Sequence, residues 1–240
     1  MSALLISDLH LSPERPAITR AFIHFLSAHA AQVDELYILG DLFEAWIGDD
    51  DPSELAKQVK QSLRQLSDRG TAVFIQHGNR DFLLGKRFMR EAAARLIEDI
   101  HSLEFCGTTT LLMHGDTLCT DDIDYQRFRR KSRRPIYRWC LSHLPLRHRQ
   151  KLATRWRAKS RMANSNKASA IMDVNSDEVD RVMAQYGASC LIHGHTHRPQ
   201  RHQLSNGGER LVLGDWHHHG WFVRIDENEL ALEKFAIDPT

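Results

Sequence analysis

Short apolar runs rich in Val, Ile and Leu recur along this chain of 240 residues, and five of them end abruptly in Asp, His or Asn. Each run has the length and content of a buried β-strand that leads into a polar loop. Segments with apolar residues at helical spacing, such as 16–31 and 52–66, lie between the runs. Alternating strands and helices predict an α/β fold. The five runs are 3–6, 35–39, 71–75, 109–113 and 189–192.

The composition is that of a folded protein. Hydrophobic residues make up 42% of the chain and charged residues 26%, which argues against global disorder. No run approaches the ~18 apolar residues of a membrane span, and the N-terminus lacks the basic start of a signal peptide. The four cysteines form no C-x-x-C pair, as in a reduced cytosolic protein. We therefore expect a cytoplasmic protein with a single domain over 1–240.

A strongly basic segment interrupts the alternation. Residues 125–172 hold fifteen of the 32 Lys and Arg residues and no Asp or Glu. Two prolines would divide the segment into shorter helices. We expect a helical insertion, or cap, at about 122–172. After the last polar motif, the pattern predicts a hairpin or meander of short strands at 210–213, 220–225 and 230–237.

The residues that end the five apolar runs can form a metal centre. In open α/β sheets, ligand sites lie beyond the carboxyl ends of the strands, where these residues would meet. In extended D-x-H and H-x-H segments, residues i and i+2 point the same way, so each pair can bind one ion. Nitrogen and oxygen donors without a thiolate favour manganese, iron or zinc. The candidate ligands are Asp8, His10, Asp41, Asn79, His114, His195 and His197.

This set of donors is larger than one tetrahedral ion requires, and it suffices for two ions that share a carboxylate. Two ions ~3.5–4 Å apart would contact both the attacking and the departing oxygen of an in-line phosphoryl displacement. They would also lower the pKa of a water molecule, so no side-chain nucleophile is required. The pattern therefore predicts a two-metal phosphoester hydrolase.

Taken together, the motifs resemble the signature of the calcineurin-like metallophosphoesterase superfamily. D-x-H, GD, GN-[HR]-D, GH and G-H-x-H all appear in order, although His114 precedes the glycine of the fourth motif. The resemblance covers essentially the whole chain and implies two central β-sheets flanked by helices. It implies that Asp41 bridges two metals. One would be held by Asp8, His10, Asp41 and His197, and the other by Asp41, Asn79, His114 and His195.

Arg80 narrows the resemblance, because many members of the superfamily have His at this position. A guanidinium offers a bidentate fork to phosphate oxygens and cannot act as a general acid near neutral pH. With the segments 40–50, 193–199 and 214–216, Arg80 resembles the UDP-2,3-diacylglucosamine diphosphatase family of lipid A biosynthesis. This resemblance implies attack of water on the α-phosphorus, giving UMP and 2,3-diacylglucosamine 1-phosphate, with two Mn²⁺ ions. Arg80 and His195 are then the expected catalytic residues.

The basic segment offers the cations and the apolar groups that a diphosphate with two acyl chains needs. Four of its residues fall at helical spacings of three and four, so they share one helix face. They are Arg157, Ser160, Asn164 and Lys167. Asp122 could accept a hydrogen bond from a sugar hydroxyl, although a helix N-cap is an alternative role for it. The predicted substrate contacts are Asn79, Arg80, Asp122, Arg157, Ser160, Asn164, Lys167 and His195. The predicted acyl pocket is lined by Trp139, Leu141, Leu152, Trp156 and Met162.

The same segment needs an anionic partner, because like charges without acids repel one another. Anionic headgroups at the inner membrane would supply one, with apolar side chains entering the surface. Charge reversal at Arg129, Arg133 and Arg147 is then expected to weaken binding to liposomes. We expect a nucleotide-activated lipid as substrate, peripheral association with the inner membrane, and no obligate protein partner.

A nuclease or nucleotide phosphodiesterase with the same metal pair is the main alternative. A basic segment that bears aromatic residues could follow a phosphate backbone. The Leu and Trp content of the segment and the presence of Arg80 argue against this, so no nucleic-acid partner is expected. A non-catalytic binding module is disfavoured because every ligand position is filled.

Overall fold

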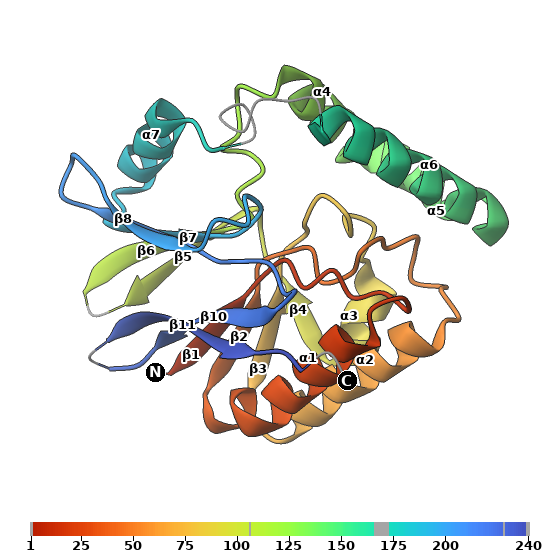
Figure 1. Ribbon diagram of the computed structural model, residues 1–240, viewed down its shortest axis with the longest axis horizontal. Helices are drawn as coiled ribbons and strands as arrows, with labels where there is room; N and C mark the ends of the chain where they lie inside the picture. The colour runs from red at the N-terminus through yellow and green to blue at the C-terminus, as the bar shows by residue number, and fades with distance from the viewer. Residues whose placement is uncertain (1, 106, 166–172, 228, 239–240) are drawn as a thin grey trace.

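Two β-sheets pack face to face between helices in the computed structural model, which describes residues 2–105, 107–165, 173–227 and 229–238 (Figure 1). The six-stranded sheet has the order β11-β10-β1-β2-β3-β4, and the five-stranded sheet has the order β5-β6-β7-β9-β8. The strands are β1 (Ala3–Ile6), β2 (Glu35–Ile38), β3 (Ala72–Ile75), β4 (Ala94–Leu96), β5 (Ile100–Phe105), β6 (Thr108–Met113), β7 (Cys190–His193), β8 (Gln200–Gln203), β9 (Glu209–Val212), β10 (His219–Ile225) and β11 (Leu230–Ala236). The expected α/β fold with two central sheets is confirmed.

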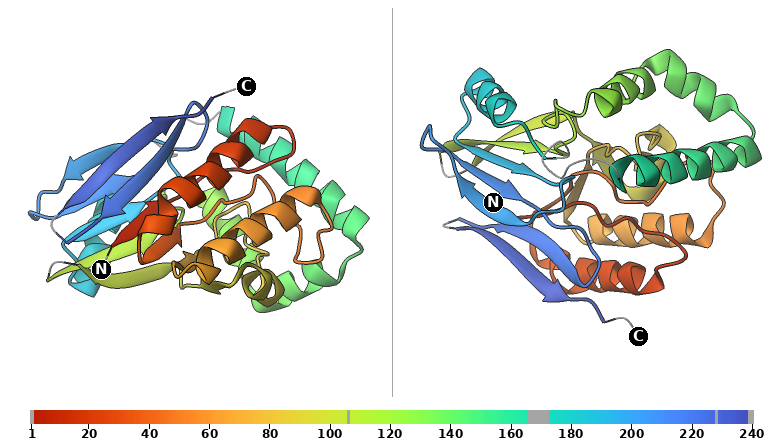
Figure 2. Two further views of the ribbon diagram at one scale, coloured as in Figure 1. Left: turned by 90° about the horizontal axis from the view of Figure 1, so that it is seen from below. Right: turned by 45° about the horizontal axis from the view of Figure 1, so that its top comes forward.

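Helices cover the outer faces of both sheets (Figures 1 and 2). One apolar cluster joins the six-stranded sheet to α1, α2 and α3, and another joins the five-stranded sheet to α7. A third cluster fills the space between the sheets. The helices are α1 (Pro16–Ala28), the 3₁₀ turn η1 (Ala30–Gln32), α2 (Glu54–Asp68), α3 (Lys86–Ala92), α4 (Ile123–Ser132), α5 (Pro135–His143), α6 (Leu146–Ser165) and α7 (Ser176–Tyr186).

Strand β1 shows why its run of four apolar residues forms a fully buried strand. Successive side chains of a strand point to opposite faces. Leu4 and Ile6 accordingly pack in the cluster under the helices, whereas Ala3 and Leu5 pack in the cluster between the sheets. Both faces of the strand are buried among apolar side chains, so no polar residue appears until the chain leaves the sheet at Ser7. The polar motif therefore begins at the end of the strand.

Parallel pairing places the polar motifs on one side of the molecule. β1, β2 and β3 are parallel neighbours, as are β6 and β7 in the second sheet. The loops that follow them are joined by backbone hydrogen bonds, among them Asp8 N to Gly40 O at 3.2 Å and Gly194 N to His114 O at 2.9 Å. The carboxyl ends of five strands thus meet across the two sheets.

Two expectations about individual elements are confirmed only in part. The helix expected at 52–66 is α2, which begins at Glu54 because the Ser53 hydroxyl caps it by accepting a hydrogen bond from Ala56 N. Of the three strands expected as a hairpin or meander, the last two form a hairpin, and the first joins the other sheet. β10 and β11 form a hairpin in the six-stranded sheet, whereas β9 lies in the other sheet between β7 and β8. Pattern alone did not show which sheet each short strand would join.

Up to Ser165, the basic segment folds into α4, α5 and α6, which we call the cap. Pro135 lies in the first turn of α5, and Pro145 directly precedes α6, so the two prolines separate the helices as expected. The cap lies beside the loops that follow β2 and β3 (Figure 2). None of the described helices is long and apolar enough to cross a membrane.

Candidate metal centre

The candidate ligands stand out by their backbone conformation. Six non-glycine residues of the described chain have positive φ, a region that side chains other than Gly avoid. Five of them are candidate ligands, and the sixth, Ala93, ends α3. The expectation that D-x-H and H-x-H are extended is therefore wrong, because both ends of each motif are left-handed. Backbone strain of this kind gathers at functional sites. The five are Asp8 (φ 55°), His10 (51°), Asp41 (52°), His195 (67°) and His197 (56°).

Two groups of side chains are arranged closely enough to hold an ion each. Asp8, His10 and His197 form the first group, and Asp8, Asp41 and His114 form the second, with ligand atoms within 4.8 Å of one another. His197 Nε2 lies 3.3 Å from both Asp8 Oδ1 and His10 Nε2. Asp8 belongs to both groups, and Asp41 of the second group also approaches the first, with its carboxylate oxygens 3.8 Å from His10 Nδ1 and 3.9 Å from His114 Nε2.

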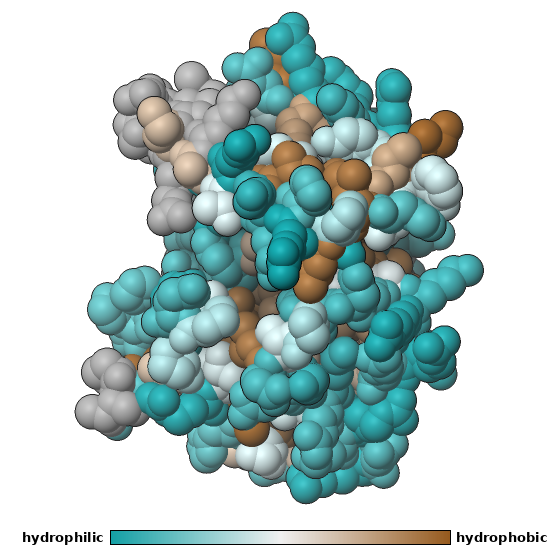
Figure 3. All heavy atoms as spheres, turned by 90° about the vertical axis from the view of Figure 1, so that its right-hand side faces the viewer, coloured by the Kyte–Doolittle hydropathy of each residue, from teal (hydrophilic) through white to brown (hydrophobic). Residues whose placement is uncertain are grey.

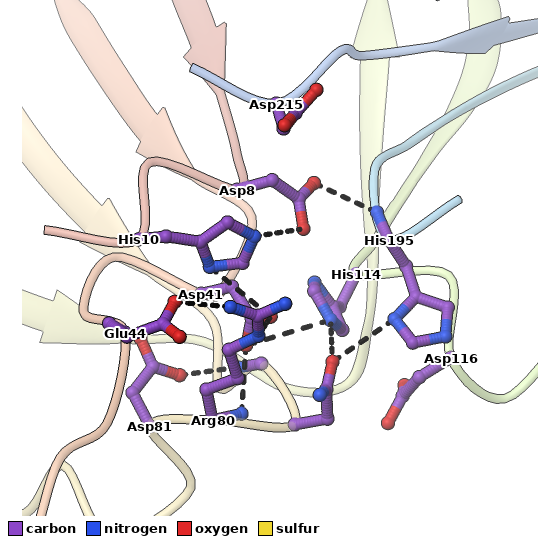
Figure 4. Close-up of polar contacts among 12 residues, drawn as sticks. Asp8, His10, Asp41, Glu44, Arg80, Asp81, His114, Asp116, His195 and Asp215 are labelled. Carbon is purple, nitrogen blue, oxygen red and sulfur yellow. Dashed lines mark hydrogen bonds and ion pairs between the residues drawn. The ribbon is translucent and has the colours of Figure 1, made fainter. Parts of the chain in front are cut away.

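Asn79 and His195 complete the second half of the centre, and His195 is labelled in Figure 4. The Asn79 side-chain oxygen is 3.0 Å from His114 Nε2 and 3.0 Å from His195 Nδ1. The ring of His114 donates its Nδ1–H to the Leu39 carbonyl at 2.8 Å, which leaves Nε2 free to act as a ligand. The structure thus brings all seven predicted ligands into one cluster.

The charges of this cluster fit a pair of divalent cations. Asp8 and Asp41 are buried, and burial raises the pKa of Asp41 despite His114 and Arg80 nearby. Burial alone would also raise the pKa of Asp8, but three histidines, His197 foremost, hold it well below its usual value. Among the described residues, Asp8 Oδ1 and His10 Nδ1 make no hydrogen bond. Two buried carboxylates, together with oxygen and nitrogen atoms that have no hydrogen-bond partner, are a suitable site for hard or borderline metal ions.

Arg80 points into the middle of the cluster (Figure 4). Its Nε lies 3.3 Å from Asp41 Oδ2, its Nη1 donates to Glu44, and its backbone N–H donates to Asp41 Oδ1 at 2.8 Å. Asp81 does not pair with Arg80, because it accepts the N–H groups of Leu42 and Gly78 and so joins two loops. A guanidinium in this position can contact a phosphate bound at the cluster.

The family follows from residues 1–199, which match the model of calcineurin-like phosphoesterases. The chain belongs to this family. Among curated relatives, the UDP-2,3-diacylglucosamine hydrolases of Azotobacter vinelandii and Pseudomonas aeruginosa are each 52% identical to this phosphoesterase. Both alignments cover 99% of this chain and 100% of the relative.

Solved structures support the fold alone. A double mutant of Vps29 from Entamoeba histolytica has a TM-score of 0.51 at 15% identity, over 98% of this chain and 92% of that one. An archaeal phosphodiesterase has a TM-score of 0.50 at 12% identity, over 98% of this chain and 99% of that one. Both share the two-sheet architecture of this phosphoesterase.

The predicted contacts in the cap are less well defined. Arg157 reaches the loop after β2, whereas Ser160 is exposed on α6. Asp122 caps α4, since its Oδ1 accepts the Tyr125 N–H at 3.1 Å. The side chain of Asn164 and the whole of Lys167 lie outside the described residues. Contact of these five residues with a sugar or an acyl chain stays a prediction.

Two side chains near the centre were missed by sequence reasoning. Glu44 binds Arg80 and Arg157, and Tyr125 packs its ring 5.8 Å from that of His195 while its hydroxyl donates to Asp116. Tyr125 carries no sequence signal that separates it from other cap aromatics. Glu44 does, because it is the one charged residue in the apolar run 42–47.

Gly194 is expected to tolerate no side chain. A Cβ there would lie 2.1 Å from Asp8 Oδ2 and 2.2 Å from Ser7 Oγ. Gly194→Ala should therefore push the Asp8 carboxylate out of the cluster and lower phosphoesterase activity by at least about tenfold, as loss of ligand orientation does. Metal content and activity of the purified variant test this. Gly207→Ala is the control for a glycine with open space around it, and equal losses in both variants would contradict the prediction.

Proposed function

We propose that this phosphoesterase hydrolyses the pyrophosphate bond of UDP-2,3-diacylglucosamine to UMP and 2,3-diacylglucosamine 1-phosphate. The observation that carries the proposal is a guanidinium, that of Arg80, pointing into a cluster of seven metal-type donors. The names of relatives that are 52% identical over the whole chain agree with it.

Different residues of the chain would have different roles in this reaction. A divalent metal pair, which we propose to be Mn²⁺, would activate water and neutralise phosphate charge when bound by the seven donors. Arg80 would hold the phosphate in line, and Asn79, His114 and His195, whose donor atoms lie 3.0 Å from one another in two pairs, would hold metal beside it. Burial, and His114 after it, lower the pKa of His195 to about 4, so its ring is neutral near pH 7 and acts as a ligand or acceptor.

Incubation with UDP-2,3-diacylglucosamine, with and without Mn²⁺, tests the reaction, with UMP measured by mass spectrometry. Manganese-dependent UMP is the expected result. Oxygen-18 from labelled water should appear in UMP, because attack is at the α-phosphorus. No UMP from protein that holds metal would refute the lipid substrate. Hydrolysis of single-stranded DNA or RNA by the same protein would favour the nuclease alternative.

Apolar side chains exposed on the cap support an amphiphilic substrate and a membrane surface. Ile136, Trp139 and Met162 are 78%, 62% and 71% exposed, so the last two do not line a closed pocket in this structure. Figure 3 shows apolar side chains among hydrophilic ones over the upper part of the molecule, where the cap lies. We propose that this face associates peripherally with the cytoplasmic side of the inner membrane.

The basic side chains available to bind a membrane surface differ in part from those that the sequence suggested. Arg129 and Arg133 are directed at buried Asp116, with Arg129 Nε 2.7 Å and Arg133 Nη2 3.9 Å from its carboxylate. Arg147, Lys151 and Arg155 are exposed and recur every four residues on α6.

Charge reversal of these three, Arg147→Glu, Lys151→Glu and Arg155→Glu, is expected to weaken binding to liposomes with anionic lipids. Each basic residue near such a surface contributes about 1 kcal/mol, so the triple variant should lose on the order of a hundredfold in partitioning. Co-sedimentation at low salt measures this. Asp124→Lys, which adds charge at the exposed start of α4, is the control, and unchanged binding of the triple variant would remove the proposal.

A further inference from the structure

Glu44 stands between two cations that come from different parts of the molecule. It lies in the loop after β2, and its Oε2 accepts a hydrogen bond from Nη1 of Arg80. Its Oε1 accepts one from Nη2 of Arg157. Arg80 belongs to the loop after β3 and Arg157 belongs to α6, so the carboxylate joins the metal centre to the cap.

Without this carboxylate the two guanidiniums would repel each other. Burial lowers the pKa of Arg157, the charge of Arg80 lowers it further, and Glu44 opposes both effects. The side chains of Arg80 and Arg157 are only 19% and 18% exposed, so water screens their repulsion incompletely. Glu44 offsets one of the two charges, and it is the carboxylate that contacts both guanidiniums, since Asp41 lies 3.3 Å from Nε of Arg80.

Both guanidiniums retain donors for a ligand. Nε of Arg157 is buried and makes no hydrogen bond to any described residue, and Nε of Arg80, which also makes none, lies 3.3 Å from Asp41 Oδ2. Buried donors of this kind are costly unless a ligand supplies an acceptor. A diphosphate has two neighbouring groups of anionic oxygens, which match two guanidiniums placed side by side.

The backbone around Glu44 is held on both sides. Its own N–H donates to the Leu11 carbonyl at 3.0 Å, and Trp46 N–H donates to the Arg80 carbonyl at 3.0 Å. Asp49, farther along the same loop, accepts a hydrogen bond from the indole of Trp46 at 3.2 Å. The backbone at Glu44 is therefore held by hydrogen bonds to the loops after β1 and β3, in addition to the contact of the same loop with Arg149 of the cap.

We propose that Glu44 is a positioning residue that holds Arg80 and Arg157 together as one receptor for the diphosphate of the substrate. This inference rests on the proposed function. Glu44 itself contacts the two arginines and not the reacting atoms. When a diphosphate binds, the arginines keep their contacts to Glu44 and turn their remaining donors to the phosphate oxygens.

A merely structural role would be shared by Asp50, which provides the matched control. Its carboxylate binds Arg149 of α6 and so also attaches the cap to a loop after β2, away from Arg80 and Arg157. We expect Glu44→Gln to lower kcat/KM by roughly tenfold, because one of the two carboxylate oxygens becomes an NH2 donor that faces a guanidinium, and the negative charge is lost. Asp50→Asn should leave kcat/KM within about twofold, and Glu44→Asp should recover part of the loss. Equal losses in Glu44→Gln and Asp50→Asn would overturn the proposal.

A double-mutant cycle tests whether Glu44 acts through Arg157. In an Arg157→Gln background, Glu44→Gln should cost no more than about twofold, and losses that multiply would refute the inference. Binding of inorganic phosphate to the metal-loaded proteins, followed by calorimetry, separates this inference from the proposed function. If the wild type does not cleave the lipid, the proposed function fails. Weaker phosphate binding by Glu44→Gln, but not by Asp50→Asn, would still support the arginine pair, and unchanged binding would refute it.

Discussion

Asp41→Asn is expected to remove at least about a hundredfold of the phosphoesterase activity and most of the bound metal. Its carboxylate lies between His10 and His114, one histidine from each half of the centre, and contacts Arg80 as well. The amide keeps the shape but removes the negative charge that two cations require. Replacing groups that only orient a ligand costs about 10–100-fold, so loss of a central ligand should exceed that range.

Metal content after gel filtration and the rate of UMP release measure the effect. Glu54→Gln makes a similar carboxylate-to-amide change at a side chain that is 89% exposed, and it should retain both metal and activity. Ser7→Ala removes the 2.7 Å hydrogen bond to Asp8 Oδ2 while it keeps every ligand, so its loss should be smaller. An Asp41→Asn protein with two metals and normal turnover would show that the centre is organised around other residues.

The position of the centre could be predicted from sequence because of simple strand chemistry. A buried strand such as β1 excludes polar side chains, so Asp8 marks the place where the chain leaves the sheet. Parallel pairing then brings such places together. The backbone conformation of the motif could not be predicted, since the spacing of Asp8 and His10 favoured an extended segment. The left-handed backbone of Asp8 and His10 is imposed by the cluster and by backbone contacts to the next loop, which are long-range.

Long-range contacts also explain why the partners of the basic residues in the cap could not be predicted from the sequence. Its lack of acids suggested an external anion, but several of its arginines pair with carboxylates of the body, at Glu44, Asp50 and Asp116. These partners precede their arginines by between thirteen and more than a hundred residues, as for Arg149 and Asp50 at 99 and Arg157 and Glu44 at 113. Net charge along a segment cannot show such pairs. Part of the cap's charge therefore attaches it to the body, and exposed basic residues remain on α4 and on α6.

Asp116→Ala is expected to destabilise the protein by about 3 kcal/mol, because it leaves buried arginines without their carboxylate. Asp116 accepts from Arg129 Nε at 2.7 Å and from the Tyr125 hydroxyl, and its side chain is 2% exposed. Breaking a buried pair by removing one partner costs roughly 3–5 kcal/mol. The lower end applies because Arg129 keeps Asp99 at 2.7 Å. Denaturant unfolding measures the loss, with Asp124→Ala as a control at an exposed pair worth about 0–1 kcal/mol.

The difference in the free energy of unfolding between wild type and Asp116→Ala should depend on pH, and this dependence identifies the carboxylate charge as its cause. Burial alone would raise the pKa of Asp116, but Arg129, and to a lesser extent His114 and Arg133, hold it well below the ordinary value of 3.8. A carboxyl group whose pKa is lower in the folded state stabilises the protein fully above the pKa of the unfolded chain. The advantage of wild type over Asp116→Ala should thus be constant near neutral pH and shrink as the pH falls below about 4. A difference that stayed constant down to pH 2 would mean that packing, and not the ion pair, attaches α4 to the loop after β6.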